Sequence, residues 1–238
     1  MKTILITLSL SVICLSFSFK KADNTTGTYT IDGKTYTGKV STQALADTLE
    51  ISAPSVSGML KKLSELGLVR HEKYQGATLT ESGQKIALEL IRHHRLLETY
   101  LHQALGYALE DVHAEAERLE HHISEDFEAR ISALLGHPTH DPHGDPIPTL
   151  EGIIPDCASR PLAQMFVGEQ ATIGRIREHS PAFVKHIALL GLTPGAKIKI
   201  LEISLPAGTL TLEVDGVAVH TLSLDAAQKL FVMEQVKS

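Results

Sequence analysis

Histidine and carboxylate side chains are dense in the stretch HAEAERLEHH, residues 113–122. Helical spacing places four of them on one face, beside an apolar stripe, while Glu115 and His122 point away. The four are His113, Glu117, Glu120 and His121. Acidic and imidazole groups at the edge of a core repel and desolvate one another unless a positive charge lies among them. A divalent cation would satisfy all four, so the pattern indicates a metal site.

The preceding predicted helix, over about residues 80–104, repeats this pattern. His94 and Glu98 are four residues apart and share a face with apolar neighbours such as Leu101. Two such helices packed together could close a site of nitrogen and oxygen ligands, which suits Mn²⁺ or Fe²⁺ better than Cu⁺, with Zn²⁺ as a further option. For any single histidine–glutamate pair a solvated helix face is the alternative, and only the joint pattern favours a metal.

No catalytic motif accompanies these residues. The chain has no H-E-x-x-H, no G-x-S-x-G and no phosphate-binding loop, so we expect no catalytic residue and no enzyme. Cys14 and Cys157 lie far apart in unlike contexts, which supports neither a disulfide framework nor a cysteine metal site. The net charge of −6 argues against nucleic-acid binding only if it is spread evenly. The negative charge is instead concentrated in one segment, because nine acids and one base lie between Glu98 and Glu128.

Residues 41–79 predict a winged helix-turn-helix, with two short helices followed by two short strands about Gln75-Gly76. The helices turn inward the apolar residues Leu45, Ala46, Leu49, Val56, Met59, Leu60 and Leu63. Hydroxyl side chains at the start of the second helix can contact phosphates and base edges, and nearby bases can contact phosphates. The predicted DNA-binding residues are Ser52, Pro54, Ser55, Ser57, Lys61, Lys62, Arg70 and Lys73. A protein-interaction module is the alternative.

The remaining segments predict one more long helix and a β-rich tail. The helix covers roughly residues 109–134, and six of the ten prolines then lie between His137 and Pro161, as in a linker or an extended wrap. Short alternating runs from Pro161 onward are typical of a small β-barrel. At the N-terminus, residues 1–19 resemble a secretory signal, with a buried strand or helix as the alternative. Residues 28–37 predict a β-hairpin about Asp32-Gly33.

Four stretches stand in a characteristic order: ISAPSVSGMLKKLSELGLV, GATLTESGQKIALELIRHHRLLE, VHAEAERLEHHIS and HDPHGDPIP. Together they resemble the diphtheria-toxin-repressor family of iron- and manganese-dependent transcriptional regulators, from about Val40 to the end of the chain. The resemblance implies a mainly α fold with β structure. It consists of a winged helix-turn-helix, a helical dimerisation and metal-sensing domain and a C-terminal SH3-like small β-barrel of the FeoA type.

The resemblance also implies roles for the candidate ligands. His94, Glu98 and His113 match the family's ancillary metal site, and Glu117, Glu120 and His121 match its regulatory site. Glu178 stands where the C-terminal domain can lend a carboxylate. Manganese is the first choice of metal because manganese sensors of the family carry an acid, and iron sensors a cysteine, at the position of Glu117.

These features predict a cytoplasmic, metal-activated repressor of manganese or iron uptake genes. It would bind double-stranded operator DNA as a homodimer, without a stable membrane partner. The expected domains are a leader and hairpin over 1–38, the winged helix over 39–80, the helical domain over 81–140, a linker over 141–160 and the barrel over 161–238. Residues 2–22 contain no acid or methionine, unlike the ligand-bearing first helix of the family. The regulatory site could thus lack ligands that the family draws from its first helix. Because residues 1–19 resemble a secretory signal, an exported or tethered metal-binding protein without a regulatory role is the alternative.

Overall fold

The computed structural model describes residues 18–19, 28–31, 34–37, 39–72, 75–155 and 159–233. The chain divides into two compact units. The first unit comprises residues 1–94, 120–123 and 148–154, and the second comprises residues 95–119, 124–147 and 155–238. None of the helices among the described residues has the length and apolar character needed to span a bilayer.

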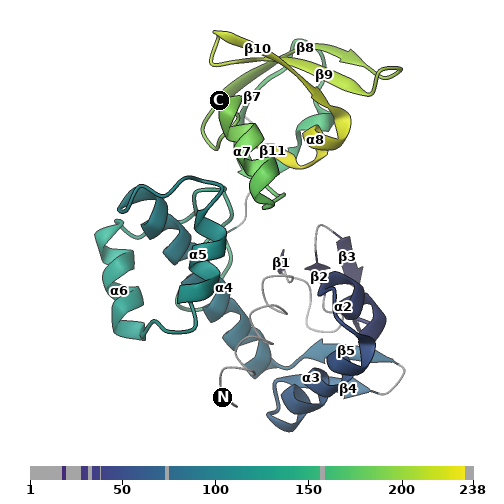
Figure 1. The fold of residues 1–238 in the computed structure, drawn as a ribbon, viewed down its shortest axis with the longest axis vertical. Coiled ribbons are helices and arrows are strands. Elements are labelled where there is room, and N and C mark those ends of the chain that lie inside the picture. Colours follow the sequence, from purple (N-terminus) through teal and green to yellow (C-terminus); the bar gives the residue numbers. More distant parts are fainter. Residues whose placement is uncertain are drawn as a thin grey trace. The chain divides into compact units, whose positions relative to one another are not determined.

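The first unit holds the predicted winged helix-turn-helix, whose helices and hairpin lie side by side (Figure 1). Its elements are α2 (Thr42–Thr48), α3 (Ala53–Glu65), β4 (Val69–Glu72), β5 (Gly76–Leu79) and the first part of α4 (Glu81–Gln103). Ser41 and Ser52 begin the two short helices, since each side chain accepts a hydrogen bond from a backbone N–H three residues on. Pro54 lies in the first turn of α3, and β4 pairs antiparallel with β5, as predicted.

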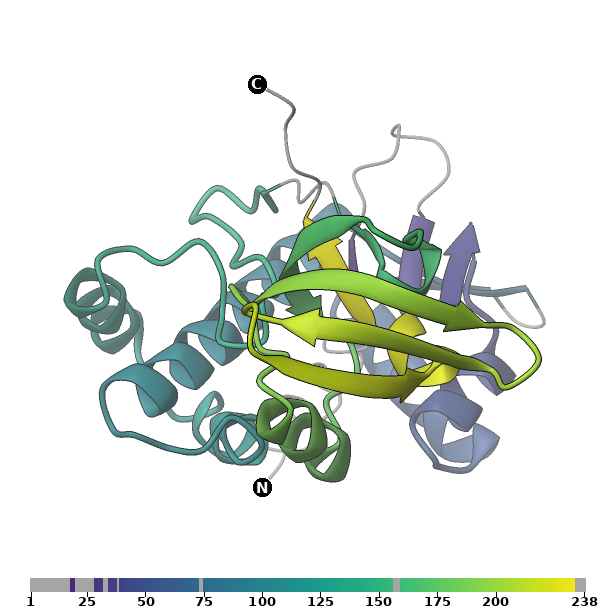
Figure 2. The same cartoon turned by 90° about the horizontal axis from the view of Figure 1, so that it is seen from above.

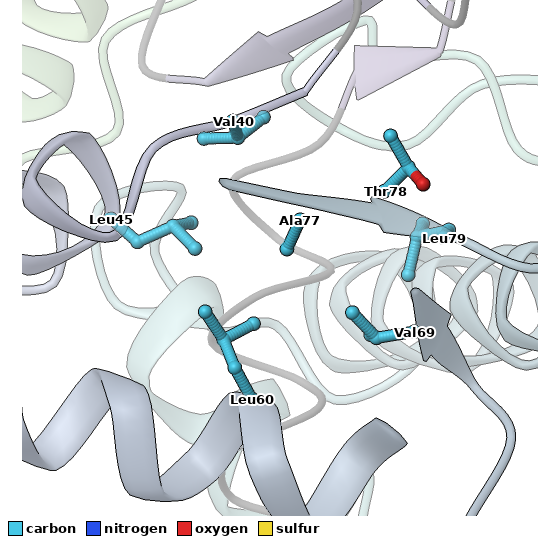
Figure 3. A pocket seen from close by; sticks show the side chains of 7 residues that line it. All are labelled: Val40, Leu45, Leu60, Val69, Ala77, Thr78 and Leu79. Carbon is cyan, nitrogen blue, oxygen red and sulfur yellow. The ribbon is translucent and has the colours of Figure 1, made fainter. Parts of the chain in front are cut away.

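The core of this unit is apolar. Leu45, Leu60 and Val69 are almost fully buried, and their side chains converge with those of Val40 and Leu79 on a small hollow (Figure 3). Its remaining lining residues are Ala77 and Thr78. A lining with one polar side chain offers no set of metal ligands, so this hollow belongs to the packing of the domain.

A small sheet precedes the winged helix. It consists of β1 (Ser18–Phe19), β2 (Thr28–Ile31) and β3 (Lys34–Thr37), in the order β1-β2-β3. Ile31 pairs with Lys34 and Thr28 with Thr37, which confirms the predicted hairpin. The rest of the signal-like run and the turn Asp32-Gly33 lie outside the described residues.

In the second unit, the remainder of α4 is followed by α5 (Val112–Leu119) and α6 (Glu125–Leu134). The prediction of one helix over residues 109–134 was therefore wrong. Ser124 has an extended backbone and its side chain accepts a hydrogen bond from Phe127 N–H, so it starts a new helix instead of continuing the old one. Glu120 and His121 consequently lie in the turn after α5 and not on its face.

The C-terminal part of this unit is the expected small barrel. Its six-stranded antiparallel sheet has the order β10-β9-β8-β7-β11-β6, and its strands lie side by side in Figure 2. The elements are β6 (Ser159–Pro161), the 3₁₀ helix η1 (Leu162–Gln164), β7 (Gln170–Ile176), α7 (Pro181–Leu189), β8 (Lys197–Ser204), β9 (Thr209–Val214), β10 (Ala218–Ser223), α8 (Leu224–Gln228) and β11 (Leu230–Met233). Alternating residues such as Leu210 and Leu212 fill the core.

Candidate metal centre

Helix α4 carries two candidate ligands on its buried face. His94 and Glu98 are 2% and 1% exposed, and they continue the apolar stripe that includes Ile91 and Leu101. The spacing of three or four residues along a helix explains why all four share this face. His94 and Glu98 lie beside apolar residues on one face, as predicted, and a buried carboxylate requires a compensating partner.

In the first unit, His94 meets Glu120. Nδ1 of His94 lies 2.7 Å from Oε2 of Glu120, and both side chains are buried. Nε2 of His121 lies 3.6 Å from the other oxygen, Oε1, of Glu120. Among the described residues Oε1 of Glu120 has no hydrogen-bond partner, which is costly for a buried carboxylate. A cation bound by this oxygen would remove that cost, so the residues present fit a divalent metal.

In the second unit, Glu98 meets His113. Nδ1 of His113, in the first turn of α5, lies 3.0 Å from Oε1 of Glu98. Glu117 lies one turn further along α5 and is half-buried. The structure thus brings Glu98 together with His113, and His94 together with Glu120 and His121.

The segment 141–147 adds a histidine that the sequence prediction missed. His143 is 1% exposed, its Nε2 lies 3.2 Å from the carbonyl oxygen of Leu109, and its Nδ1 lies 3.7 Å from Oε2 of Glu98. Burial opposes the charged imidazolium, but Glu98 and two aspartates outweigh burial and raise the pKa of His143 to about 9. The motif HDPHGDPIP contained the signal, a histidine between two acids in a proline-rich stretch.

Backbone contacts hold this segment close to the barrel. Ile176 N–H, at the end of β7, donates to the carbonyl oxygen of His143. Gly144 has a φ of 86°, and a Cβ there would lie 1.9 Å from the carbonyl oxygen of Gly174. Only glycine fits this close approach, so Gly144 fixes the position of the neighbouring histidine.

Buried ion pairs hold the same segment. Arg175 on β7 contacts Asp145, and Arg95 on α4 lies 3.7 Å from Asp141 and 3.6 Å from Asp145. Burial, with the negative charges of Asp145 and Glu98, raises the pKa of Asp141 to about 7. Burial alone would raise the pKa of Asp145, but Arg175 and Arg95 lower it well below its ordinary value.

The barrel also brings a histidine, His179, close to Asp145 and Glu98. The ligand atoms of Glu98, His143 and His179 lie within 4.8 Å of one another. Glu178 instead accepts a hydrogen bond from Ser180 N–H and lies 3.7 Å from Lys229. Glu178 as a ligand stays a prediction, and the neighbouring histidine is the residue that the sequence prediction missed.

The predicted DNA-binding residues lie at the surface of the winged helix. Ser52, Pro54, Ser55 and Ser57, at the start of α3, are exposed, as are Lys61, Lys62 and Arg70. The Ser52 and Ser57 hydroxyls also serve the helix itself, since Ser52 caps it and Ser57 donates to the carbonyl oxygen of Ala53. Lys73 lies outside the described residues.

Three domain families match the chain in succession. The iron dependent repressor N-terminal DNA binding domain matches residues 28–77. The iron dependent repressor metal binding and dimerisation domain matches residues 80–149, and the FeoA domain matches residues 160–234. The chain is also 32% identical over 184 residues to the iron-dependent repressor IdeR of Mycobacterium tuberculosis, covering 72% of this chain and 79% of that relative. The chain belongs to the iron-dependent repressor family.

The chain is also similar to a repressor described by its dependence on manganese. A solved structure described as a manganese-dependent transcriptional repressor in complex with manganese is 35% identical, with a TM-score of 0.77, and the match covers 96% of this chain and 98% of that one. The transcriptional regulator MntR of Lysinibacillus sphaericus is 36% identical over 91 residues, which are 38% of this chain and 65% of that protein. The names of these similar proteins therefore include both iron and manganese. The comparisons support the regulator and not the exported metal-binding protein.

Proposed function

We propose that this protein is a metal-dependent transcriptional repressor of manganese or iron uptake genes. The observation that carries the proposal is the joint presence of an exposed α3 with its wing and of buried Glu120 and Glu98, each in contact with a histidine. Buried carboxylates beside imidazoles are costly unless a cation joins them. The relatives named as iron- and manganese-dependent repressors support the same conclusion.

We assign two metal sites to the chain. Glu117, Glu120 and His121 form the regulatory site, and His94, Glu98 and His113 form the ancillary site. A bound divalent cation supplies the positive charge that these carboxylates lack. Glu120 would present Oε1 to it, while His94 orients Glu120 through Oε2. Glu178 remains a candidate for an additional ligand.

Manganese is the proposed physiological metal. An oxygen ligand at Glu117 favours a hard cation such as Mn²⁺, and Fe²⁺ is the next choice because it accepts the same nitrogen and oxygen donors. Zn²⁺ would bind in vitro, since imidazole nitrogen and carboxylate oxygen are both zinc ligands.

We propose that α3 enters the major groove of operator DNA. The exposed residues Ser52, Pro54, Ser55 and Ser57 would face base edges and phosphates. Lys61, Lys62, Arg70 and Lys73 would neutralise phosphates, so affinity would fall with salt. Because a repressor must reach its operator, we propose that the protein acts in the cytoplasm, where the DNA lies.

A homodimer fits the surface of the helical domain. Leu105, Phe127 and Leu134 are 54%, 42% and 70% exposed. We propose that a second copy covers these side chains, because the family model matched to this domain is a dimerisation domain. A second copy would place two winged helices on the two halves of a palindromic operator. In this arrangement the DNA-binding domain comprises residues 39–80 and the dimerisation and metal-sensing domain comprises residues 81–140. The linker 141–160 joins the latter to the barrel, residues 161–238.

The test is fluorescence anisotropy of the full chain on a pool of promoter fragments, with and without Mn²⁺, Fe²⁺ or Zn²⁺. We expect metal to promote binding and Glu120→Ala to abolish the metal effect. Glu115→Ala is the matched control, because Glu115 is an acid on the neighbouring helix paired with Arg118. DNA binding that micromolar metal leaves unchanged would refute the proposal.

A further inference from the structure

Glu98 faces a different imidazole with each of its two carboxylate oxygens. Oε1 lies 3.0 Å from Nδ1 of His113 on α5, and Oε2 lies 3.7 Å from Nδ1 of His143 in the segment 141–147. Glu98 and His143 are each 1% exposed. One buried carboxylate therefore lies between two histidines from different parts of the chain.

His143 can present the lone pair of Nδ1 to a cation that lies beside Glu98. Its Nε2 lies 3.2 Å from the carbonyl oxygen of Leu109, which can only accept, so Nε2 carries a hydrogen. A cation would therefore take the place of the second ring proton, on Nδ1. In the part of the chain that the structure describes, Nδ1 has no hydrogen-bond partner. Donor atoms around one cation, with bonds of about 2.0–2.2 Å, lie roughly 3–4 Å apart. The 3.7 Å separation is that of two ligands of one cation.

His179 is oriented in the same way. Its Nε2 lies 3.2 Å from Oδ2 of Asp145, so the carboxylate can accept the ring hydrogen and leave Nδ1 to bind a metal. The ligand atoms of Glu98, His143 and His179 lie within 4.8 Å of one another. A carboxylate behind a ligand histidine is the usual outer support of a metal site.

A further oxygen in this region has no hydrogen-bond partner. Oδ1 of Asp141 accepts from the backbone N–H groups of His143 and Asp145, but among the described residues its buried Oδ2 has no such partner. Arg95 Nε lies 3.7 Å from this oxygen, beyond hydrogen-bond distance, and Arg95 and Arg175 both pair with Asp145. The second unit thus holds further nitrogen and oxygen donors around Glu98, and His143 faces its Oε2.

We propose that Glu98 is shared by two neighbouring cations. One binds Oε1 with His113, as part of the ancillary site, and the other binds Oε2 with His143 and His179. The inference rests on the proposed function, because it adds a cation beside one of the sites assigned there. The second site takes a divalent metal of the same class, since its donors are again imidazole nitrogen and carboxylate oxygen.

The experiment counts manganese ions per chain by native mass spectrometry of the full-length protein with manganese(II) chloride. We expect His143→Ala and His179→Asn each to lose one ion, and the double variant to lose no more than either single variant. His113→Ala should lose a different ion, and Glu98→Gln should lose two. His186→Ala is the matched control, because His186 is an exposed histidine on α7 of the same domain.

Electron paramagnetic resonance gives an independent readout. Two Mn²⁺ ions on one carboxylate are magnetically coupled, so His179→Asn should convert a broadened signal into the six-line signal of an isolated ion. His179 is partly exposed, and its variant keeps the test valid if the fully buried His143 cannot be replaced without unfolding.

Two results would overturn the inference. One is an ion count that His179→Asn leaves unchanged in a folded protein. The other is the loss of the same single ion in the His113, His143, His179 and Glu98 variants, which would mean one cation among all four residues. If manganese still promotes DNA binding in either case, only the shared carboxylate is refuted. If manganese never affects DNA binding, the proposed function fails separately.

Discussion

Replacing Arg175 by methionine removes the guanidinium that contacts the buried Asp145. The side chains of Arg175 and Asp145 are 18% and 2% exposed, so water replaces little of the lost interaction. Breaking a buried ion pair from one side costs about 3–5 kcal/mol. Because Arg95 and His179 still face Asp145, we expect a loss of about 3 kcal/mol in the free energy of unfolding of the barrel.

The assay is urea unfolding followed by circular dichroism, with hydrogen exchange of the β7 and β11 amides to locate the loss. Asp145→Asn and the double variant complete a mutant cycle, and the double variant should recover part of the loss because it leaves no unpaired buried charge. Arg130→Met is the control, since Arg130 pairs with Asp126 at the surface and should cost less than about 1 kcal/mol.

The pH dependence has a defined sign. The folded-state pKa of Asp145 is lowered from 3.8, so the stability that its charge contributes is present above that value and is lost as pH falls through the folded-state pKa. The difference between the parent and Arg175→Met should therefore shrink in acid. Additive single-variant losses, each below about 1 kcal/mol, would refute this view of the ion pair.

Four further outcomes are expected. Leu60→Ala should destabilise the winged helix by about 2–5 kcal/mol, measured by urea unfolding, because this leucine is fully buried at the apolar hollow. Lys62→Ala should lower the slope of log affinity for DNA against log salt by about 1 in anisotropy titrations. Ser55→Ala should weaken DNA binding without unfolding α3, whereas Ser52→Ala should also cost about 1 kcal/mol of helix stability, seen by circular dichroism. Because the pKa of His143 is raised to about 9, its imidazole is protonated at pH 7, and metal binding there should release a proton. The affinity of this site for metal should therefore increase about tenfold per pH unit up to pH 9, and calorimetry in two buffers would measure the released proton.

Local patterns were enough to predict the winged helix and the buried face of α4. Ser41, Ser52 and Pro54 mark helix starts by their own chemistry, and His94 and Glu98 continue an apolar stripe at helical spacing. These signals are contained within single elements, so no tertiary contact is needed to read them. The break between α5 and α6 had a local signal as well, the capping residue Ser124, which the apolar periodicity concealed.

The cluster around Glu98 could not be predicted in the same way. His143 reaches it from an irregular proline-rich segment that Gly144 and Arg95 hold in place. Glu178 and His179 are neighbours in the sequence just after β7, so their side chains point in different directions. Which of the two faces the cluster depends on the residue at which β7 ends. Such contacts join distant segments, and periodicity carries no information about them.

The most direct test of the central claim is the affinity of the full-length protein for Mn²⁺ measured with and without operator DNA. Linkage requires that a metal which promotes DNA binding is itself bound more tightly when DNA is present, and by the same factor. The account predicts a tighter manganese isotherm on DNA that becomes equal to the DNA-free isotherm in Glu120→Ala. Equal manganese affinities with and without operator in the unmodified protein would contradict it.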